Sequence, residues 1–403
     1  MLIKIAFGVL TSKVVAVFVG PNGMALVANL RNFMTSLESI STLGFQAGIV
    51  KYITENQENK TQIQKIISTV FYCLFCITFM ISCILYLFSD YWNYKIFGSN
   101  KEYLLIFKVM ALILPLYAFS LVFISIVNGF CQFKKVIYIN IIGTLVGFVL
   151  TFFLIHKYTI LGALLSITIT PALMFFVTFF YISKQINLFK NIKIKYFDFQ
   201  IIKNLSSYSL MALVSAVLGS LVFLAIRNHI IENLGLKQAG FWEAISRISG
   251  YYMLFSGTLL TLYFLPKLIL ANSKQETKLV FYSYFKTTLP IYCLGFLILY
   301  FLRHFIIQTL FTKDFLPTTD LFFWQLFGDL FKVASLVLGF QFIAKKMTKE
   351  FVISEIMSLA ILYFSSIYFI KIYGIQGIVI AQAFDNFLYL IVLVIFFRKN
   401  LFS

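Results

Sequence analysis

Hydrophobic residues occur along this chain in long runs separated by short polar joints. The runs lie at about 1–19, 24–50, 63–88, 103–129, 136–156, 160–183, 204–231, 239–266, 281–305, 317–344, 351–370 and 375–397. Because a helix needs about twenty apolar residues to cross a bilayer, the pattern predicts an all-α integral membrane protein with about twelve transmembrane helices. The first run lacks a small-x-small cleavage signal, so we expect it to be retained as the first span.

Composition agrees with this pattern. Of the 403 residues, 61% are hydrophobic and 12% are charged, and the mean hydropathy is +0.92. A soluble fold of this length carries about twice that share of charged residues and is excluded. The net charge of +18 would suggest nucleic-acid binding in a soluble protein. Here a membrane orientation explains the charge, and no nucleic acid is expected as a partner.

The basic residues are distributed unevenly between alternate loops. Loops on one side of the predicted helices carry about eighteen Lys and Arg, and loops on the other side carry about six. The positive-inside rule therefore predicts that both termini are cytoplasmic.

The longest joint divides the predicted helices into two groups. Residues 184–203 form a basic cytoplasmic linker between an N-terminal six-helix bundle, 1–183, and a C-terminal six-helix bundle, 204–403. Two bundles around a central cavity are a transporter arrangement. A weak internal repeat supports parallel halves, and it pairs Gly23, Arg31 and Lys51 with Gly240, Arg247 and Lys267.

Several charged residues fall inside the predicted spans, where a charge costs on the order of 3 kcal/mol. Arg31 is expected roughly 12 Å below the outer surface. Glu243 and Arg247 are spaced i, i+4, and Asp329 and Lys332 are spaced i, i+3, so that either pair can be in contact. Arg227 is close enough to a helix end for its guanidinium to reach the interface.

These charges have two interpretations: they lock helices together, or they line a water-filled central cavity with a cationic surplus. In the second interpretation an anionic, hydrated substrate contacts the bases, which are Arg31, Lys108, Arg227, Arg247 and Lys332. The carboxylates then balance charge or couple transport to ions, and they are Glu38, Glu243, Asp329, Glu355 and Asp385.

Signatures of nucleotide binding or catalysis are not found in the sequence. It contains no GxxxxGK[ST], G-x-S-x-G or HExxH motif. The five cysteines lie in or beside apolar runs, and we interpret them, including Cys73-x-x-Cys76, as core residues. No metal or cofactor is predicted, and transport driven by an ion gradient is expected.

Two segments resemble a known family. The first is Gly20–Phe33 (GPNGMALVANLRNF), followed by Gly48–Tyr52 (GIVKY), and the second is Asp320–Lys332 (DLFFWQLFGDLFK). They look like the Wzx-type flippases, in the lipid III and O-antigen translocase branch of the multidrug/oligosaccharidyl-lipid/polysaccharide exporter superfamily. Polar residues that match this branch are Arg31, Arg227, Asp329, Lys332 and Glu355, whereas Glu38, Arg247 and Asp385 depart from it.

The resemblance implies a flippase of the bacterial inner membrane. Such a protein moves undecaprenyl-diphosphate-linked oligosaccharide from the cytoplasmic to the periplasmic leaflet by alternating access. Membrane lipid surrounds it, and a polysaccharide polymerase and a chain-length regulator are implied as partners.

Two other functions fit the size and span number. A multidrug exporter of the same superfamily would extrude cationic drugs and would favour acidic lumen chemistry, whereas this chain has a basic surplus. A membrane polysaccharide polymerase would be expected to carry a large exterior loop, and the longest exterior joint here is about a dozen residues.

Overall fold

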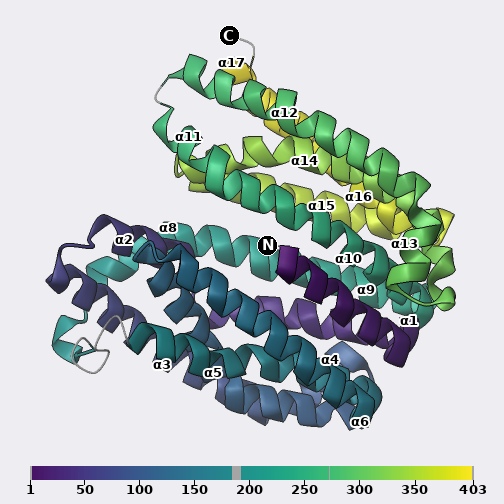
Figure 1. The fold of residues 1–403 in the computed structure, drawn as a ribbon, viewed down its shortest axis with the longest axis horizontal. Coiled ribbons are helices and arrows are strands. Elements are labelled where there is room, and N and C mark those ends of the chain that lie inside the picture. Colours follow the sequence, from purple (N-terminus) through teal and green to yellow (C-terminus); the bar gives the residue numbers. More distant parts are fainter. Residues whose placement is uncertain (1, 184–191, 272, 402–403) are drawn as a thin grey trace. The chain divides into compact units, whose positions relative to one another are not determined.

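The computed structural model describes residues 2–183, 192–271 and 273–401, and within these ranges the regular structure is helical (Figure 1). The first half holds α1 (Leu2–Ser41), α2 (Gln46–Glu55), α3 (Lys60–Leu87), α4 (Ser89–Phe97), α5 (Leu104–Gly129) and α6 (Phe133–Ser183). The second half holds α8 (Phe199–Leu213), α9 (Gly219–Leu234), α10 (Leu236–Leu259), α11 (Leu265–Leu270), α12 (Lys274–Phe301), α13 (Arg303–Leu310), α14 (Phe322–Ala344), α15 (Thr348–Tyr373), α16 (Gln376–Phe396) and α17 (Arg398–Leu401). Two π-helical segments, η3 (Val214–Leu218) and η4 (Leu260–Phe264), and three 3-10 segments, η1 (Lys101–Tyr103), η2 (Ile194–Tyr196) and η5 (Lys313–Leu321), connect them.

The number of membrane passes agrees with the predicted number. Nine helices of the described chain are long and apolar enough to cross a bilayer. Two of them contain a non-helical residue, Gly20 in α1 and Thr159 in α6, and each therefore consists of two passes. Dividing these two helices and adding the continuous segment from Leu236 to Leu270 gives twelve helical passes in the described residues.

Small residues allow the two passes of α6 to pack as an antiparallel hairpin. A Cβ built on Gly162 would lie 1.9 Å from the carbonyl oxygen of Leu154, across the Thr159 turn. Further along the hairpin, Gly147 faces Thr170. Helices in lipid commonly associate through small residues that let their backbones approach closely. The hydrophobic effect does not drive this association, because lipid tails are as apolar as the side chains.

Helix ends differ from the predicted runs where the end of a helix is polar. Helix α12 begins at Lys274 rather than near 281, because the Ser273 side chain and Glu276 form a capping box. The predicted second run, 24–50, is not one continuous helix. Helix α1 ends at Ser41, and α2 begins at Gln46 after a turn in which Leu43 and Gly44 have positive φ. The predicted linker is described only from residue 192 onward, and α8 begins at Phe199.

The chain forms two compact units. Unit 1 contains the described residues of Met1–Val19 and Leu26–Leu221, and unit 2 contains those of Gly20–Ala25 and Val222–Ser403. The units therefore divide inside α9, whereas the predicted bundles meet at the linker. The physical reason is that α8 packs against α2 and α3 and so belongs with unit 1.

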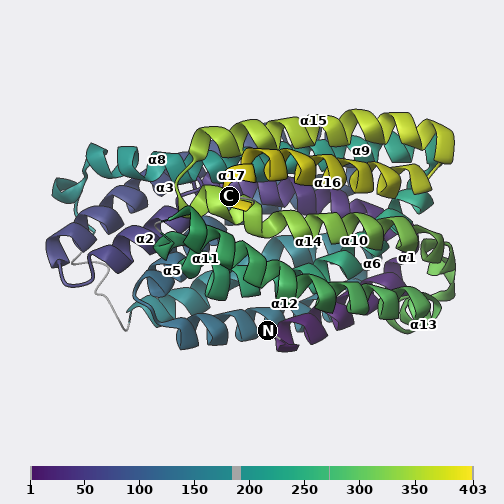
Figure 2. The same ribbon diagram turned by 90° about the horizontal axis from the view of Figure 1, so that it is seen from above.

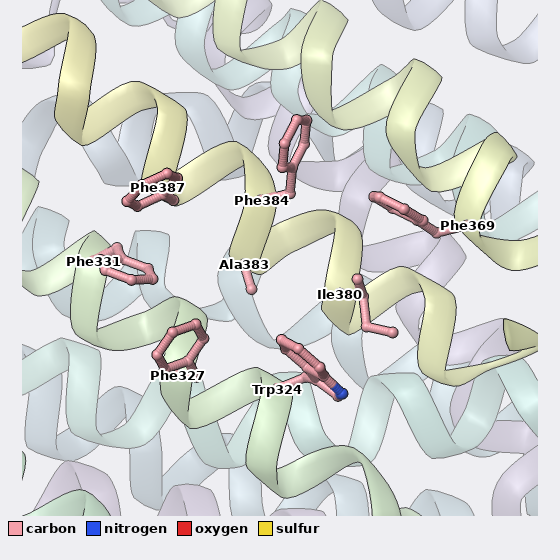
Figure 3. A pocket seen from close by; sticks show the side chains of 8 residues that line it. All are labelled: Trp324, Phe327, Phe331, Phe369, Ile380, Ala383, Phe384 and Phe387. Carbon is pink, nitrogen blue, oxygen red and sulfur yellow. The ribbon is translucent and has the colours of Figure 1, made fainter.

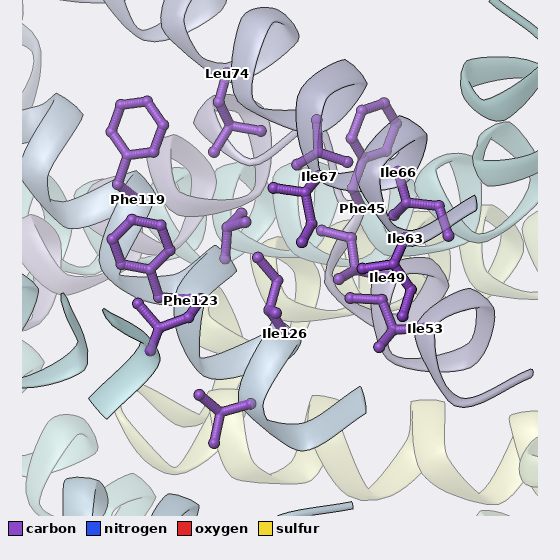
Figure 4. Packing of buried hydrophobic residues seen from close by; sticks show 14 of the residues in the cluster. Phe45, Ile49, Ile53, Ile63, Ile66, Ile67, Leu74, Phe119, Phe123 and Ile126 are labelled. Carbon is purple, nitrogen blue, oxygen red and sulfur yellow. The ribbon is translucent and has the colours of Figure 1, made fainter. Parts of the chain in front are cut away.

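The core of unit 1 gathers at one end of α3 and α5 (Figure 4). Figure 4 shows isoleucines of α2 and α3 beside phenylalanines of α5. Ile49, Ile53 and Leu74 are completely buried in this cluster. In unit 2, α14, α15 and α16 lie side by side, as Figures 1 and 2 show.

Elements of the first half recur about 214 residues further along the chain. Helix α3 (Lys60–Leu87) matches α12 (Lys274–Phe301), including the capping residues Asn59 and Ser273. The turn glycines Gly20 and Gly235, both at positive φ, are separated by a similar offset. Because equivalent helices keep their order, this spacing supports the predicted repeat.

The structure contradicts the interpretation of the cysteines as core residues. Cys73 is half-buried, whereas Cys76, Cys83, Cys131 and Cys293 are exposed. An apolar run predicts a core position poorly in a membrane protein, because spans present apolar side chains to lipid as well as to one another.

Candidate functional site

Three charged side chains of unit 2 form a buried cluster, which we call the arginine–glutamate cluster. Nη2 of Arg227 lies 3.1 Å from one carboxylate oxygen of Glu243, and Nε of Arg247 lies 2.8 Å from the other. The three residues are between 2% and 8% exposed. With two cations and one anion, the cluster carries an excess positive charge.

The hairpin of α9 and α10 brings these residues together. Gly235 (φ 93) turns the chain between the two helices, and Arg227 and Glu243 are equally far from it in sequence. Antiparallel helices place such positions at the same depth, roughly 12 Å from the turn. The Glu243–Arg247 spacing was recognised in the sequence, but the Arg227–Glu243 pair was not. Counting outward from Gly235 would have predicted it.

The environment of Arg227 corrects its predicted position at the interface. The side chain does not extend to a helix end but is 2% exposed, and its guanidinium lies over the Trp242 ring at 4.8 Å from the centroid. The Phe223 ring also stacks on the Trp242 ring. The Nε and Nη1 atoms of Arg227 have no hydrogen-bond partner among the described residues. A buried guanidinium with donors to spare is suited to bind an anion.

Asp329 lies at the centre of a second buried group. Its Oδ2 atom accepts hydrogen bonds from Ser249 at 2.6 Å, from Gln325 at 3.0 Å and from the Tyr252 hydroxyl. These donors, rather than the predicted neighbour Lys332, surround the carboxylate. Ser249, Tyr252 and Gln325 were not among the predicted site residues, because neutral polar residues in apolar helices do not stand out in a search for buried charges.

Asp385 and Lys332 belong to a third group on α14, α15 and α16. The Ser358 hydroxyl lies 2.9 Å and 3.1 Å from the two oxygens of Asp385. The charges of Glu355 and Lys332 both act on this carboxylate. Lys332 itself is exposed and forms no ion pair within the part of the chain that the structure describes.

In unit 1, Glu38 has two polar partners. The Tyr117 hydroxyl donates to it at 2.6 Å, and the Gln46 side chain donates at 3.4 Å. Arg31 is exposed and Lys108 is half-buried. The ten predicted residues therefore fall into separate groups, and the arginine–glutamate cluster holds two ion pairs. Metal-binding groups of three or more His, Cys, Asp or Glu do not occur in the described ranges.

A family model described as "polysaccharide biosynthesis protein" matches residues 1–267. The chain belongs to this family. It is 27% identical over 392 residues to the lipid III flippase of Escherichia coli (strain K12), an alignment that covers 95% of this chain and 91% of the relative. The lipid III flippase of Shigella flexneri matches with the same identity and coverage.

Solved structures share the fold of this chain. An inward-facing MATE multidrug resistance transporter of the MOP superfamily matches with a TM-score of 0.78 at 12% identity, covering 98% of this chain and 94% of that one. The lipid II flippase MurJ, in an inward closed conformation, matches with a TM-score of 0.73 at 16% identity, covering 98% and 86%. The predicted resemblance, the all-α membrane fold and the transporter class are confirmed.

Proposed function

We propose that this protein is a flippase for lipid-linked oligosaccharide in the bacterial inner membrane. It moves an undecaprenyl-diphosphate-linked glycan from the cytoplasmic to the periplasmic leaflet, with both termini in the cytoplasm. The observation that carries the proposal is the arginine–glutamate cluster in a member of this family. A diphosphate is a hydrated anion, and it needs a cationic, hydrogen-bonding partner inside the membrane.

The chemistry of the cluster suggests how the headgroup is held. Glu243 pairs with both arginines. The unused Nε and Nη1 donors of Arg227 can then bind phosphate oxygens while Glu243 keeps the guanidinium in place. The exposed cations Arg31 and Lys332 and the half-buried Lys108 provide further attraction along the path.

Transport proceeds by alternating access of the two predicted bundles, with coupling to an ion gradient through the buried carboxylates. Asp329 and Asp385, at 2% and 6% exposed, are the strongest candidates for this coupling. A polymerase and a chain-length regulator act on the translocated glycan as partners in this proposal.

The test is deletion of the gene, followed by measurement of the leaflet that holds the lipid-linked glycan and of the glycan at the cell surface. We expect intermediate to accumulate in the cytoplasmic leaflet and surface glycan to be lost. Plasmid copies carrying Arg227→Ala or Arg247→Ala should fail to restore it, whereas Lys65→Ala, which breaks a half-buried pair with Asp198, should restore it. Unchanged intermediates in a strain without a second flippase would refute the proposal.

The MATE likeness, which shows the fold alone, keeps a multidrug exporter as the second candidate. Expression of this protein in a drug-sensitive strain distinguishes the two. A rise in resistance to cationic drugs, together with unchanged lipid intermediates on deletion, would favour the exporter.

A further inference from the structure

A groove of about 340 Å³ lies on unit 2 between α14, α15 and α16 (Figure 3). Six of the eight side chains that line it are aromatic: Trp324, Phe327, Phe331, Phe369, Phe384 and Phe387. We call it the aromatic groove. The three residues from α14 are spaced i, i+3, i+7 and therefore form one stripe along the helix.

Close helix packing forms the floor of the groove. A Cβ on Gly328 would lie 2.7 Å from the Cα of Ala383, so α14 and α16 are almost in backbone contact there. The aromatic rings rise on either side of this contact, and Phe331 and Phe387 meet at 5.1 Å between centroids. Phe327, Phe384 and Phe387 are each 43% exposed, so the rings are open to a ligand from outside the unit.

The lining differs from an ordinary lipid-facing surface of the same unit. The exposed face of α12 is mainly aliphatic, with Leu279, Ile291, Leu294, Leu297 and Ile298 each at least 50% exposed. Saturated acyl chains pack well against such an aliphatic surface. Concentrated aromatic faces favour a chain that presents double bonds and methyl branches, since these pack closely against rings.

A cation lies near the middle of α14, next in sequence to a residue of the groove lining. Lys332 directly follows Phe331 of the lining, is exposed, and is roughly 15 Å along the helix from Phe322, the first residue of α14. A lysine inside a span is costly unless anions or water accompany it, and the Asp385 carboxylate, on which its charge acts, is one such anion. An apolar groove with a cation at one end is complementary to a lipid whose long chain carries an anionic head.

We infer that the aromatic groove binds the polyprenyl chain of the lipid-linked substrate, while Lys332 attracts its phosphate on the path to the arginine–glutamate cluster. This inference rests on the proposed function. On the proposed topology the groove extends from the level of Lys332 toward the periplasmic end of α14. A lipid that enters from the cytoplasmic leaflet has its chain pointing in this direction, so head and chain occupy the two places together.

The test uses the full chain in phosphatidylcholine nanodiscs and three probes: undecaprenyl phosphate, undecaprenol, and phosphatidic acid with saturated chains. The double variant Phe384→Ala/Phe387→Ala should bind both polyprenyl probes about tenfold more weakly, a loss of about 1.4 kcal/mol, with no change for phosphatidic acid. Lys332→Ala should weaken the binding of undecaprenyl phosphate and leave the binding of the other two probes unchanged. Phe364→Ala, which removes a 69% exposed ring outside the groove, should change nothing.

Equal binding of the polyprenyl probes by the parent and the double variant would overturn the inference. The inference would also be overturned if the double variant bound phosphatidic acid more weakly by the same factor, because the groove would then hold bulk lipid. Neither result affects the leaflet measurement in the deletion strain, so failure of the groove and failure of the flippase proposal can be told apart.

Discussion

The Tyr117 hydroxyl donates a hydrogen bond of 2.6 Å to the Glu38 carboxylate and so joins α5 to the second pass of the chain. In unit 2, the Tyr252 hydroxyl of α10 donates to Asp329 of α14. Glu38 and Tyr252 are separated by the repeat offset, and Asp329 lies within about one helical turn of the position equivalent to Tyr117. Each half therefore joins its second and fourth passes by a tyrosine–carboxylate bond, with the two roles exchanged.

We predict that the first of these bonds contributes more to stability than the second. Tyr117→Phe leaves Glu38 with the long contact from Gln46, and we expect a loss of about 1.5–3 kcal/mol. Tyr252→Phe leaves Asp329 with the donors Ser249 and Gln325, and about 1 kcal/mol should be lost. Thermal unfolding in detergent measures both. The opposite order would contradict the prediction.

A second prediction concerns the counter-charge in the arginine–glutamate cluster. Glu243→Gln removes the carboxylate charge that pairs with the buried cations Arg227 and Arg247, and the free energy of unfolding should fall by about 3–5 kcal/mol. Adding pyrophosphate should recover part of this loss if the cluster binds anions. Lys65→Ala is the control, since it breaks an ion pair that is more exposed than the cluster and should have a much smaller effect. A stable Glu243→Gln variant would show that the arginines are compensated in another way.

A third prediction compares two glycines. Gly162→Ala forces a methyl group into the backbone of Leu154, and the α6 hairpin should lose on the order of 1–3 kcal/mol or more. Gly295 lies in α12, and open space surrounds the Cβ position. Gly295→Ala should therefore be neutral or stabilise the helix by about 0.5–1 kcal/mol. Equal effects in an unfolding assay would mean that the hairpin is not packed as described.

The sequence predicted what depends on hydrophobic length and missed what depends on pairing between helices. Twelve passes follow from apolar runs alone, and the Glu243–Arg247 contact follows from spacing within one helix. The partners of Asp329 did not follow, because Ser249 and Tyr252 come from α10 and neutral polar residues give no signal in a charge search. Arg227 was misplaced for a similar reason: distance from a helix end suggests the interface, but a carboxylate on the neighbouring helix holds it inside.

The last prediction uses the docking of the segment before α8 onto α3. Asp198 accepts a hydrogen bond from Lys65 at 3.0 Å and another from the Gln200 amide at 2.9 Å. The Lys65 side chain first, and the amide second, hold the pKa of the Asp198 carboxyl below its ordinary value. A carboxyl whose pKa is lower in the folded state stabilises the fold above its unfolded pKa of about 3.9, and this stability disappears as pH falls through the folded pKa.

Asp198→Asn isolates this effect, because asparagine can still cap α8 but cannot pair with Lys65. The melting temperature of the variant should lie below that of the parent at pH 7, and the difference should shrink as the pH is lowered from about 5 toward 2. Glu58→Gln is the control, because Glu58 is exposed on the loop between α2 and α3. A difference between parent and Asp198→Asn that stays constant over this range would mean that the charge of Asp198 does not hold the segment on α3.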